Sequence, residues 1–451
     1  MKGDALKIIA TENGSPGAEQ IIDTFFRLEA GRMVSTLTRI FGLDNIDLAE
    51  DVVQDAMLKA LQYWSYGNIP ANPSGWIMEV AKNRALDMLR RETLFHNKEE
   101  VISKDFQGAI TASDPAALFS EAEVKDDQLR MIFACCHPLL TNESQIALTL
   151  KTLCGLGVAE IARSFLTSEE TIAKRLVRAK QKLRKMRVPF EVPAGAELSQ
   201  RLDSVSQVLY LLFNEGYNAS QGESLIRWDL STEAIRLSDL LLGHPACNFP
   251  KTNALHALML LHAARFPARL GDDGSILLLQ DQDRARWNRT MVEWGLFYLE
   301  QSATGGELSE FHLQAGIAAC HCLADSYETT DWRKILSLYD LLVGISDSPV
   351  FALNRAVAVS KVEGPLAGLR AVAEIENTKP ICSYYLLYAV LAEFHLDLGE
   401  IGAAASYLNK ALGLTTVKGE QAFLRKKLDR CEGRWVNLKA EAVTGSPNRQ
   451  N

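Results

Sequence analysis

The chain has 451 residues, too many for one ordinary hydrophobic core, so roughly two to four domains are expected. Hydrophobic residues make up 47% and charged residues 23%, which is the composition of a folded protein rather than a disordered one. The net charge of −8 argues against a surface that coats nucleic acid as a whole. No run of about 18 apolar residues predicts a membrane span, and no apolar signal segment opens the chain, so a cytoplasmic protein is expected.

The eight cysteines are scattered through apolar helical patterns, and we expect them to be reduced thiols in the core. The sequences CCH at 135–137 and CHC at 320–322 lack a second ligand pair at zinc-site spacing. Adjacent helical residues also point about 100° apart, so they chelate a metal poorly. We therefore predict no metal site and no cofactor.

Helical periodicity runs through nearly the whole chain, without a convincing strand pattern, and predicts an all-α fold. The irregular segment 96–121 and the proline-containing segment 188–199 are expected to be linkers. They leave helical blocks at 18–95, 122–187 and 200–440. The polar tail that follows is expected to be disordered.

The stretch DLAEDVVQDA, residues 47–56, opens a helix with an apolar stripe and an acidic face. Its period buries Ala49, Val52, Val53, Ala56 and Ala60. The outer face is then expected to carry Glu50, Asp51, Gln54 and Asp55. Such a face is usually only solvated, so by itself it indicates no function.

The next helix is expected to begin with Asn72 as its cap and Pro73 in its first position. Its exposed side combines polar and charged residues, namely Lys82, Asn83, Asp87, Arg90 and Arg91. Aromatic residues lie around the preceding loop: Tyr63, Trp64, Tyr66 and Trp76. Aromatic rings beside cations suit unstacked, single-stranded bases. The alternative, that these rings are simply core, remains open, particularly for Trp64 and Trp76.

The stretch GVAEIARSFLTSEETIAKRLVRAKQKLRK, residues 157–185, predicts a helix-turn-helix. Val158, Ile161 and Ala162 are expected to face a small core, and Ser168 is a good N-cap for the second helix. The buried stripe of that helix is expected to be Ile172, Leu176, Ala179 and Leu183, opposite a polar face of Thr171, Lys174, Arg175, Arg178 and Lys182. Eight Lys or Arg and no acid lie between residues 171 and 187. This pattern favours a helix that reads DNA in the major groove over a solvated basic face.

The last block contains a repeat. Residues 348–375 resemble residues 383–412, with glycine turns at Gly364 and Gly399. The offset of about 35 residues is close to the tetratricopeptide period of about 34. Small residues such as Ala371, Ala403 and Ala405 are expected to let paired helices approach closely, although an irregular helical bundle is the alternative.

The order of these motifs resembles that of sigma-70-family factors of the extracytoplasmic-function type, over roughly residues 18–187. The resemblance implies two small helical sigma domains, a region 2 bundle and a region 4 helix-turn-helix, followed by a tetratricopeptide-like domain. Core RNA polymerase and promoter DNA are the implied partners, without a membrane. Polymerase binding is implied for Asp47, Glu50, Asp51, Gln54 and Asp55.

In the same family, the segment matching GWIMEVAKNRALDMLRR melts and reads the −10 element. This implies −10 contacts by Tyr63, Trp64, Trp76, Lys82, Asn83, Asp87, Arg90 and Arg91. The helix-turn-helix matches the region that reads the −35 element. This implies −35 contacts by Ser168, Glu170, Thr171, Lys174, Arg175, Arg178 and Lys182.

The motifs LYLLFNEGYNAS at 209–220 and ILLLQDQDRARWN at 276–288 resemble a subgroup with a long helical extension that is thought to regulate the sigma core in cis. The resemblance implies contacts between the sigma domains and the residues Asn214, Glu215, Gly216 and Tyr217. From the residues alone, the first motif also predicts a helix end with a glycine cap. The second equally predicts a salt-bridge cluster of Asp281, Asp283, Arg284 and Arg286.

Three classes of function are compatible with the sequence. A promoter-specificity factor explains all the blocks. A conventional helix-turn-helix regulator with a helical-repeat sensor leaves residues 18–95 unexplained. An enzyme is disfavoured because no P-loop, GxSxG, HExxH or dinucleotide fingerprint occurs.

Overall fold

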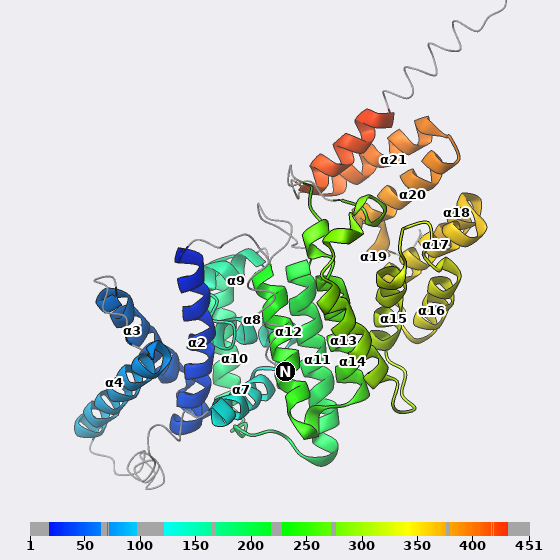
Figure 1. The fold of residues 1–451 in the computed structure, drawn as a ribbon. Coiled ribbons are helices and arrows are strands. Elements are labelled where there is room, and N and C mark those ends of the chain that lie inside the picture. The colour runs from blue at the N-terminus through cyan, green and yellow to red at the C-terminus, as the bar shows by residue number, and fades with distance from the viewer. Residues whose placement is uncertain are drawn as a thin grey trace, which may run out of the picture. The chain divides into compact units, whose positions relative to one another are not determined.

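The computed structural model describes residues 18–64, 70, 72–96, 121–164, 167–217, 228–271, 277–375, 379–415, 417 and 419–431. Within these ranges the regular elements are helices, and no β-strand occurs (Figure 1). The predicted all-α fold is confirmed. The described residues up to 216, together with 228–247, form one compact unit, and Tyr217 together with those from 248 onward forms a second.

The first unit contains the acidic helix and the helix-turn-helix. Its elements are α2 (Ala18–Phe41), η1 (Leu43–Asn45), α3 (Ile46–Trp64), α4 (Pro73–His96), α7 (Glu121–Cys135), α8 (Asn142–Thr152), α9 (Val158–Ser164), α10 (Glu169–Lys185), α11 (Gly195–Tyr217), α12 (Trp228–Gly243) and η2 (Pro245–Cys247). Because α11 begins inside segment 188–199 and groups with α7–α10, that segment does not coincide with the boundary between the compact units. Most of the other expected linker, residues 97–120, lies outside the described residues.

Local signals explain where α3 and α4 begin. Gly42 has φ 84°, a left-handed conformation that suits glycine, and it turns the chain from α2 into η1 and α3. Pro73 is the first residue of α4, and the Asn72 side chain accepts a hydrogen bond of 3.0 Å from the Gly75 N–H. The predicted cap of α4 is therefore confirmed. The predicted buried stripe of α3 is confirmed at all of its five positions, from Ala49 to Ala60.

Helix α2 joins the two sequence blocks of the first unit. A Cβ atom on Gly31 would collide with the carbonyl oxygen of Leu153, so only glycine allows α2 to come this close to the end of α8. Further along α2, Arg39 Nε lies 2.8 Å from the fully buried carboxylate of Asp127 in α7. Burial raises the pKa of Asp127, although Arg39 and Arg130 favour its ionised form.

The second unit is a series of helices in which neighbours in sequence pack on each other (Figure 1). Its elements are α13 (Pro250–Ala263), η3 (Phe266–Ala268), η4 (Leu279–Asp281), η5 (Arg284–Arg286), α14 (Arg289–Ser302), α15 (Glu310–Leu323), α16 (Trp332–Ile345), α17 (Pro349–Glu363), α18 (Pro365–Ala373), α19 (Lys379–Cys382), α20 (Tyr385–Asp397) and α21 (Ile401–Leu414). Residues 419–431 are also helical.

The repeat in the sequence corresponds to two helix pairs, α17 with α18 and α20 with α21. The predicted glycine turns are confirmed, since Gly364 has φ 93° and Gly399 has φ 77°. Of the small residues expected to allow close packing, Ala371 and Ala405 pack against the core of these helices, but other small residues are more deeply buried. Gly368 and Ala404 are buried, whereas Ala371, Ala403 and Ala405 are only half-buried, because the inward face of each helix is rotated by one position.

None of the described helices is long and apolar enough to cross a membrane. The eight cysteines form no disulfide, and all are buried except Cys382. Within the described ranges, no group of His, Cys, Asp and Glu side chains gathers in a way that could hold a metal ion.

Candidate nucleic-acid interface

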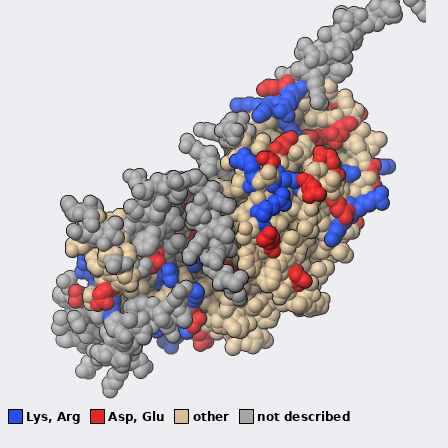
Figure 2. Space-filling model, in the orientation of Figure 1, with Lys and Arg blue, Asp and Glu red and all other residues tan. Residues whose placement is uncertain are grey.

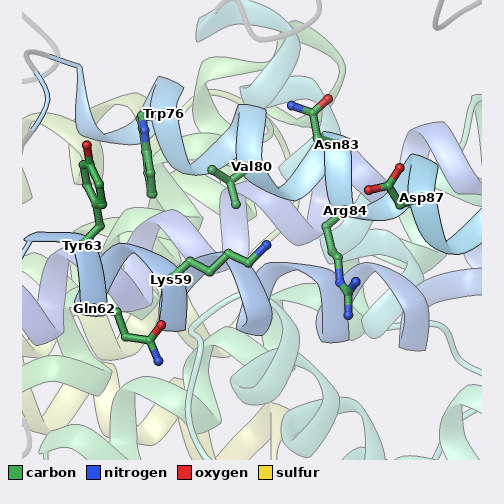
Figure 3. A pocket seen from close by; sticks show the side chains of 8 residues that line it. All are labelled: Lys59, Gln62, Tyr63, Trp76, Val80, Asn83, Arg84 and Asp87. Atoms are coloured by element: carbon green, nitrogen blue, oxygen red, sulfur yellow. The ribbon is translucent and has the colours of Figure 1, made fainter.

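A cavity of about 550 Å³ opens between α3 and α4 in the first unit. Helix α3 contributes one face of its last turns and α4 contributes an i, i+4, i+7, i+8, i+11 face. The lining residues are Lys59, Gln62, Tyr63, Trp76, Val80, Asn83, Arg84 and Asp87 (Figure 3). The cavity therefore brings together four of the eight residues that were expected to contact the −10 element.

Two aromatic rings stand at one end of this cavity. The rings of Tyr63 and Trp76 stack with 5.7 Å between centroids and 16° between planes. Trp64 also packs on Trp76, with 5.8 Å between the two ring centroids. Because Tyr63 is 54% exposed, it is accessible to a base that could stack on it.

Cations lie farther along the same cavity. In Figure 3 the Lys59 side chain runs from α3 along the cavity, and Arg84 reaches from α4 toward α3. Arg84 Nε lies 3.1 Å from Asp55 Oδ2, so an ion pair joins the two helices beneath the cavity. Sequence reasoning missed Lys59, Gln62, Val80 and Arg84. The helical spacing of Val80 and Arg84 from Trp76 was the signal that could have found them.

The remaining residues expected at the −10 element lie elsewhere or cannot be placed. Lys82 is on α4 but does not line the cavity. Arg90 and Arg91 are in the last turns of α4, and their side chains lie outside the described residues.

The acidic residues of α3 do not form one solvated face. Asp51 and Gln54 are exposed, as expected. Glu50 is only 14% exposed and faces the second block, where it accepts a hydrogen bond of 3.3 Å from the Thr152 hydroxyl. The expectation that Glu50 lies on the outer face is wrong, because α10 and the end of α8 pack against this side of α3.

Lys180 of α10 is the main partner of these acids. Its ammonium lies 2.8 Å from Asp47 Oδ1 and 2.9 Å from Glu50 Oε2, and its side chain is only 8% exposed. Burial disfavours its charged form, but Glu50 and Asp47 outweigh burial and raise the pKa of Lys180. Arg184 adds hydrogen bonds of 2.9 Å to the Asp44 carbonyl and 3.3 Å to Asp47.

A continuous exposed stripe remains on α3. Its members follow the i, i+3, i+7, i+10 spacing of one helix face and are Asp51, Gln54, Leu58 and Leu61. Leu58 and Leu61 are large exposed hydrophobic residues that sequence reasoning did not select. A stripe that is acidic at one end and apolar at the other is typical of a protein-binding surface.

Helix α10 has the geometry expected of a recognition helix. The Ser168 hydroxyl accepts a hydrogen bond from the Thr171 N–H, which confirms the predicted cap. The predicted stripe of Ile172, Leu176, Ala179 and Leu183 is buried. In the preceding helix Ile161 and Ala162 are buried and Val158 is half-buried.

The cations on the polar face of α10 differ in exposure and in their contacts. Arg178 is exposed and Arg175 is half-buried. Lys174 pairs with Glu170 at 2.6 Å, an exposed contact between successive turns. The Lys182 ammonium donates to the carbonyl oxygen of Leu139, so this residue also holds α10 to the turn that precedes α8.

The two C-terminal motifs differ from both of their simpler interpretations. Helix α11 continues through Gly216 to Tyr217, and Gly216 has no positive φ, so the predicted glycine cap is wrong. Asp283 caps η5 by accepting a 2.9 Å hydrogen bond from the Ala285 N–H. In the described part of the chain, Arg284 binds carbonyl oxygens rather than carboxylates, so the predicted salt-bridge cluster is wrong as well.

Comparison with known families supports this division of the chain. Residues 25–94 match the family described as Sigma-70 region 2, and residues 130–183 match Sigma-70, region 4. Residues 201–303 match a family of unknown function, DUF6596.

Two relatives differ in how much of the chain they share. The uncharacterized protein R00370 of Rhizobium meliloti (strain 1021) is 38% identical over 389 residues, which cover 85% of this chain and 90% of that protein. The ECF RNA polymerase sigma factor SigK of Mycobacterium ulcerans (strain Agy99) is 24% identical over 155 residues, which cover 33% of this chain and 80% of that protein. No solved structure matches the chain.

Proposed function

The chain belongs to the sigma-70 family, and we propose that it binds core RNA polymerase, directs it to specific promoters and is regulated in cis by its C-terminal helices. The observation that carries this proposal is that one chain has both an aromatic and cationic cavity and a capped basic helix. The α3–α4 cavity suits unstacked bases, and α10 suits the major groove of duplex DNA. A protein that opens a promoter must hold both forms of DNA at once.

We place the −10 contacts at the α3–α4 cavity. A base displaced from the duplex could stack on the exposed face of Tyr63 while Lys59 neutralises a neighbouring phosphate. Asn83 has the amide donors and acceptors that hydrogen-bond a base edge. Arg84 is held by Asp55, so its part is to fix the distance between the two helices.

We place the −35 contacts on α10. The exposed face of its first turns, from Ser168 to Arg178, would enter the major groove, where the forked donors of Arg175 suit a guanine edge. Glu170 holds the Lys174 ammonium and so orients it. The exposed Arg178 is placed to meet the phosphate backbone.

We assign polymerase binding to the exposed stripe of α3, residues 51, 54, 58 and 61. Asp47 and Glu50 already bind Lys180, so they are occupied in the arrangement described here. Their use by polymerase would require α10 to release them. The role of the protein is one of binding and not of catalysis, and its promoter target implies a cytoplasmic site of action.

Cis regulation by the C-terminal region is supported by the way the chain continues after α10. Arg201 of α11 donates a hydrogen bond of 2.6 Å to the carbonyl of Phe133 in α7 and is nearly buried. The sequence that follows the helix-turn-helix is thus bonded to α7, and α7 packs on α8, which in turn packs on α9 and α10. A change in α11 would therefore reach the helix-turn-helix through α7 and α8.

Run-off transcription with core polymerase tests the proposal. Only a sigma factor starts specific transcripts when it is added alone to core enzyme. Tyr63→Ala should lower promoter opening, measured by permanganate reactivity of the melted region, whereas the similarly exposed Phe297→Ala on α14 should not. Binding of duplex promoter DNA without transcripts would instead indicate a conventional helix-turn-helix regulator.

A further inference from the structure

A cluster of arginines in the second unit has no role in the functions proposed above. Arg265 follows α13, Arg269 follows η3, and Arg284 opens η5. Their guanidinium groups pack on two aromatic rings. Arg265 and Arg284 lie 5.5 and 4.6 Å from the centroid of Trp287, and Arg269 lies 3.7 Å from the centroid of Tyr217.

Arg265 is the least explained of the three. Arg265 is only 8% exposed, and its buried Nε has no hydrogen-bond partner. Its guanidinium forms no ion pair with the described residues. A buried cation normally has a carboxylate or several carbonyl groups around it, because it is otherwise costly to remove from water.

Arg269 and Arg284 are each anchored at one nitrogen. Arg269 Nη1 donates to the Tyr217 carbonyl. Arg284 Nη1 donates to the carbonyls of His321 and Ala324, at 2.6 and 2.7 Å, and so binds the C-terminal end of α15. These contacts fix the direction of both guanidinium groups, but the enclosed Nη2 of Arg284 still has no partner.

Two further enclosed donors or acceptors lie in the same cluster without a partner. They are Nε1 of Trp287, a residue that is 2% exposed, and Nδ1 of His321. Hydrogen-bonding groups of buried side chains are nearly always satisfied in folded proteins. Several unsatisfied groups gathered around one indole ring are therefore unusual.

The electrostatic environment of the cluster is positive. Burial lowers the pKa of Arg284, and the charge of Arg265 lowers it further. The exposed carboxylate of Glu328 has an opposing effect. Burial together with the same arginines lowers the pKa of His321 to about 3, so its imidazole is neutral at pH 7. The carboxylate closest in sequence to Arg284, Asp283, is exposed and bonds a backbone amide instead.

We propose that Arg265, Arg269 and Arg284 form a binding site for a small oxyanion, a molecule that carries a phosphate or carboxylate group, in the second unit of this protein. Guanidinium forks match the planar or tetrahedral oxygens of these groups, and such charge-assisted hydrogen bonds are the strong ones. Trp287 Nε1 is an additional donor for the same group. The anion would satisfy Arg265 and relieve the repulsion among the three cations.

A purely structural role accounts for only part of the cluster. Binding of helix-end carbonyls explains why Arg269 and Arg284 are arginines. It does not explain Arg265, whose side chain binds no such carbonyl among the described residues. The near-complete burial of Arg265 and Trp287 also excludes a duplex DNA backbone as the ligand, because a continuous polymer could not reach them.

Thermal unfolding of the full-length protein tests the site. Melting temperatures are measured in chloride buffer and in buffers of equal ionic strength that contain millimolar inorganic phosphate or, separately, malonate. The wild-type protein should gain about 3 °C or more with at least one of these anions, as expected for a ligand well above its Kd. Arg265→Gln should lose this gain. Arg286→Gln, which removes an exposed arginine from the same η5 element, should keep it.

The two anions identify the group that is bound. A gain with phosphate alone points to a phosphorylated molecule, and a gain with malonate alone points to a carboxylic acid. Equal gains in wild type and Arg265→Gln would overturn the proposal, because they would show general salt stabilisation. Absence of any gain in the wild type would overturn it too. If Arg265→Gln is unfolded in all buffers, Arg265→Lys takes its place in the test. An anion-induced gain in melting temperature as large in Arg265→Lys as in the wild type would then overturn the proposal.

Discussion

At the scale of single residues, Lys180 shows how a charged run in the sequence divides in the fold. The sequence predicted a cationic helix with one buried apolar stripe, and Lys180 lies one turn after Leu176 on that stripe. Its burial follows from this spacing. Its partners could not be predicted, because Asp47 and Glu50 lie more than 100 residues earlier and only the packing of α10 on α3 brings them together.

We expect Lys180→Ala to destabilise the first unit by about 1–3 kcal/mol, since it leaves the half-buried Glu50 without its ion-pair partner. Lys185→Ala, an exposed residue of the same helix, should change stability little. Urea unfolding measures both. Because the folded state raises the pKa of Lys180, its contribution to stability is complete below the ordinary value of 10.5, declines as the pH rises from there to the raised value, and is lost above it. The difference between variant and wild type should therefore be the same at pH 6 and pH 8.

The exposed stripe of α3 gives a second prediction at this scale. Asp51→Lys reverses a charge on the proposed polymerase surface without touching a described partner, so the fold should be unaffected. Affinity for core polymerase should fall by about tenfold, on the order of 1.4 kcal/mol. The same reversal at the exposed Glu363 of the second unit is the control. Equal polymerase binding by the two variants would show that this stripe is merely solvated.

At the scale of elements, caps, turns and buried stripes were predictable because they depend on neighbours in sequence. Asn72, Ser168, Gly364 and Gly399 all have the predicted local roles. The α3–α4 cavity was predicted only in part. Its aromatic end was found from the clustering of Tyr63 and Trp76, and the helical spacing of Arg84 from Trp76 could have added Arg84. Lys59 becomes a lining residue only once the angle between the two helices is known.

The recognition helix should separate base contacts from phosphate contacts. Arg175→Ala should relax sequence preference at one −35 position, at a cost of about 1–3 kcal/mol. Arg178→Ala should weaken binding to all promoters alike and lower the salt slope by about one unit, because it removes one phosphate contact. Competition binding with single-base promoter variants distinguishes the two. If Arg175→Ala instead lowers the affinity for every promoter variant by the same factor, Arg175 does not read a base.

The repeat-like helices yield a matched pair of glycine substitutions. A Cβ on Gly368 would lie 2.7 Å from Ser360 Cβ and 2.9 Å from the Phe394 ring, so Gly368→Ala should destabilise the second unit by about 1–3 kcal/mol. Gly402→Ala, in open space on α21, should stabilise by about 0.5–1 kcal/mol. Thermal unfolding compares them. A neutral Gly368→Ala would mean that α17, α18 and α20 are less tightly packed than described.

At the scale of the whole molecule, the net charge is unevenly distributed along the chain. After residue 190 the sequence has 24 basic and 31 acidic residues, although the segment before it is nearly neutral. On the face shown in Figure 2, side chains of both signs alternate over the C-terminal helices. Most of the acidic excess after residue 190 lies in residues 191–216 and 228–247 of the first unit, and the second unit has 22 basic and 24 acidic residues. A nearly neutral second unit does not favour general binding to the DNA backbone.

Deletion of residues 248–451 tests whether this second unit regulates the sigma domains. The cut leaves α11 and α12, which belong to the first unit, and so does not expose α7. We expect promoter-dependent transcription to fall by about tenfold or more, within the usual range of an intramolecular coupling. The reason is that Lys180 and Arg184 hold α10 on α3 through Asp47. We expect the second unit to be needed to release α10 from these ion pairs. Run-off transcription at equal protein concentration measures the change, after circular dichroism and thermal unfolding have shown that the truncated protein is folded. Equal transcript yields across several promoters would refute cis regulation by the second unit and leave its arginine cluster with a function separate from initiation.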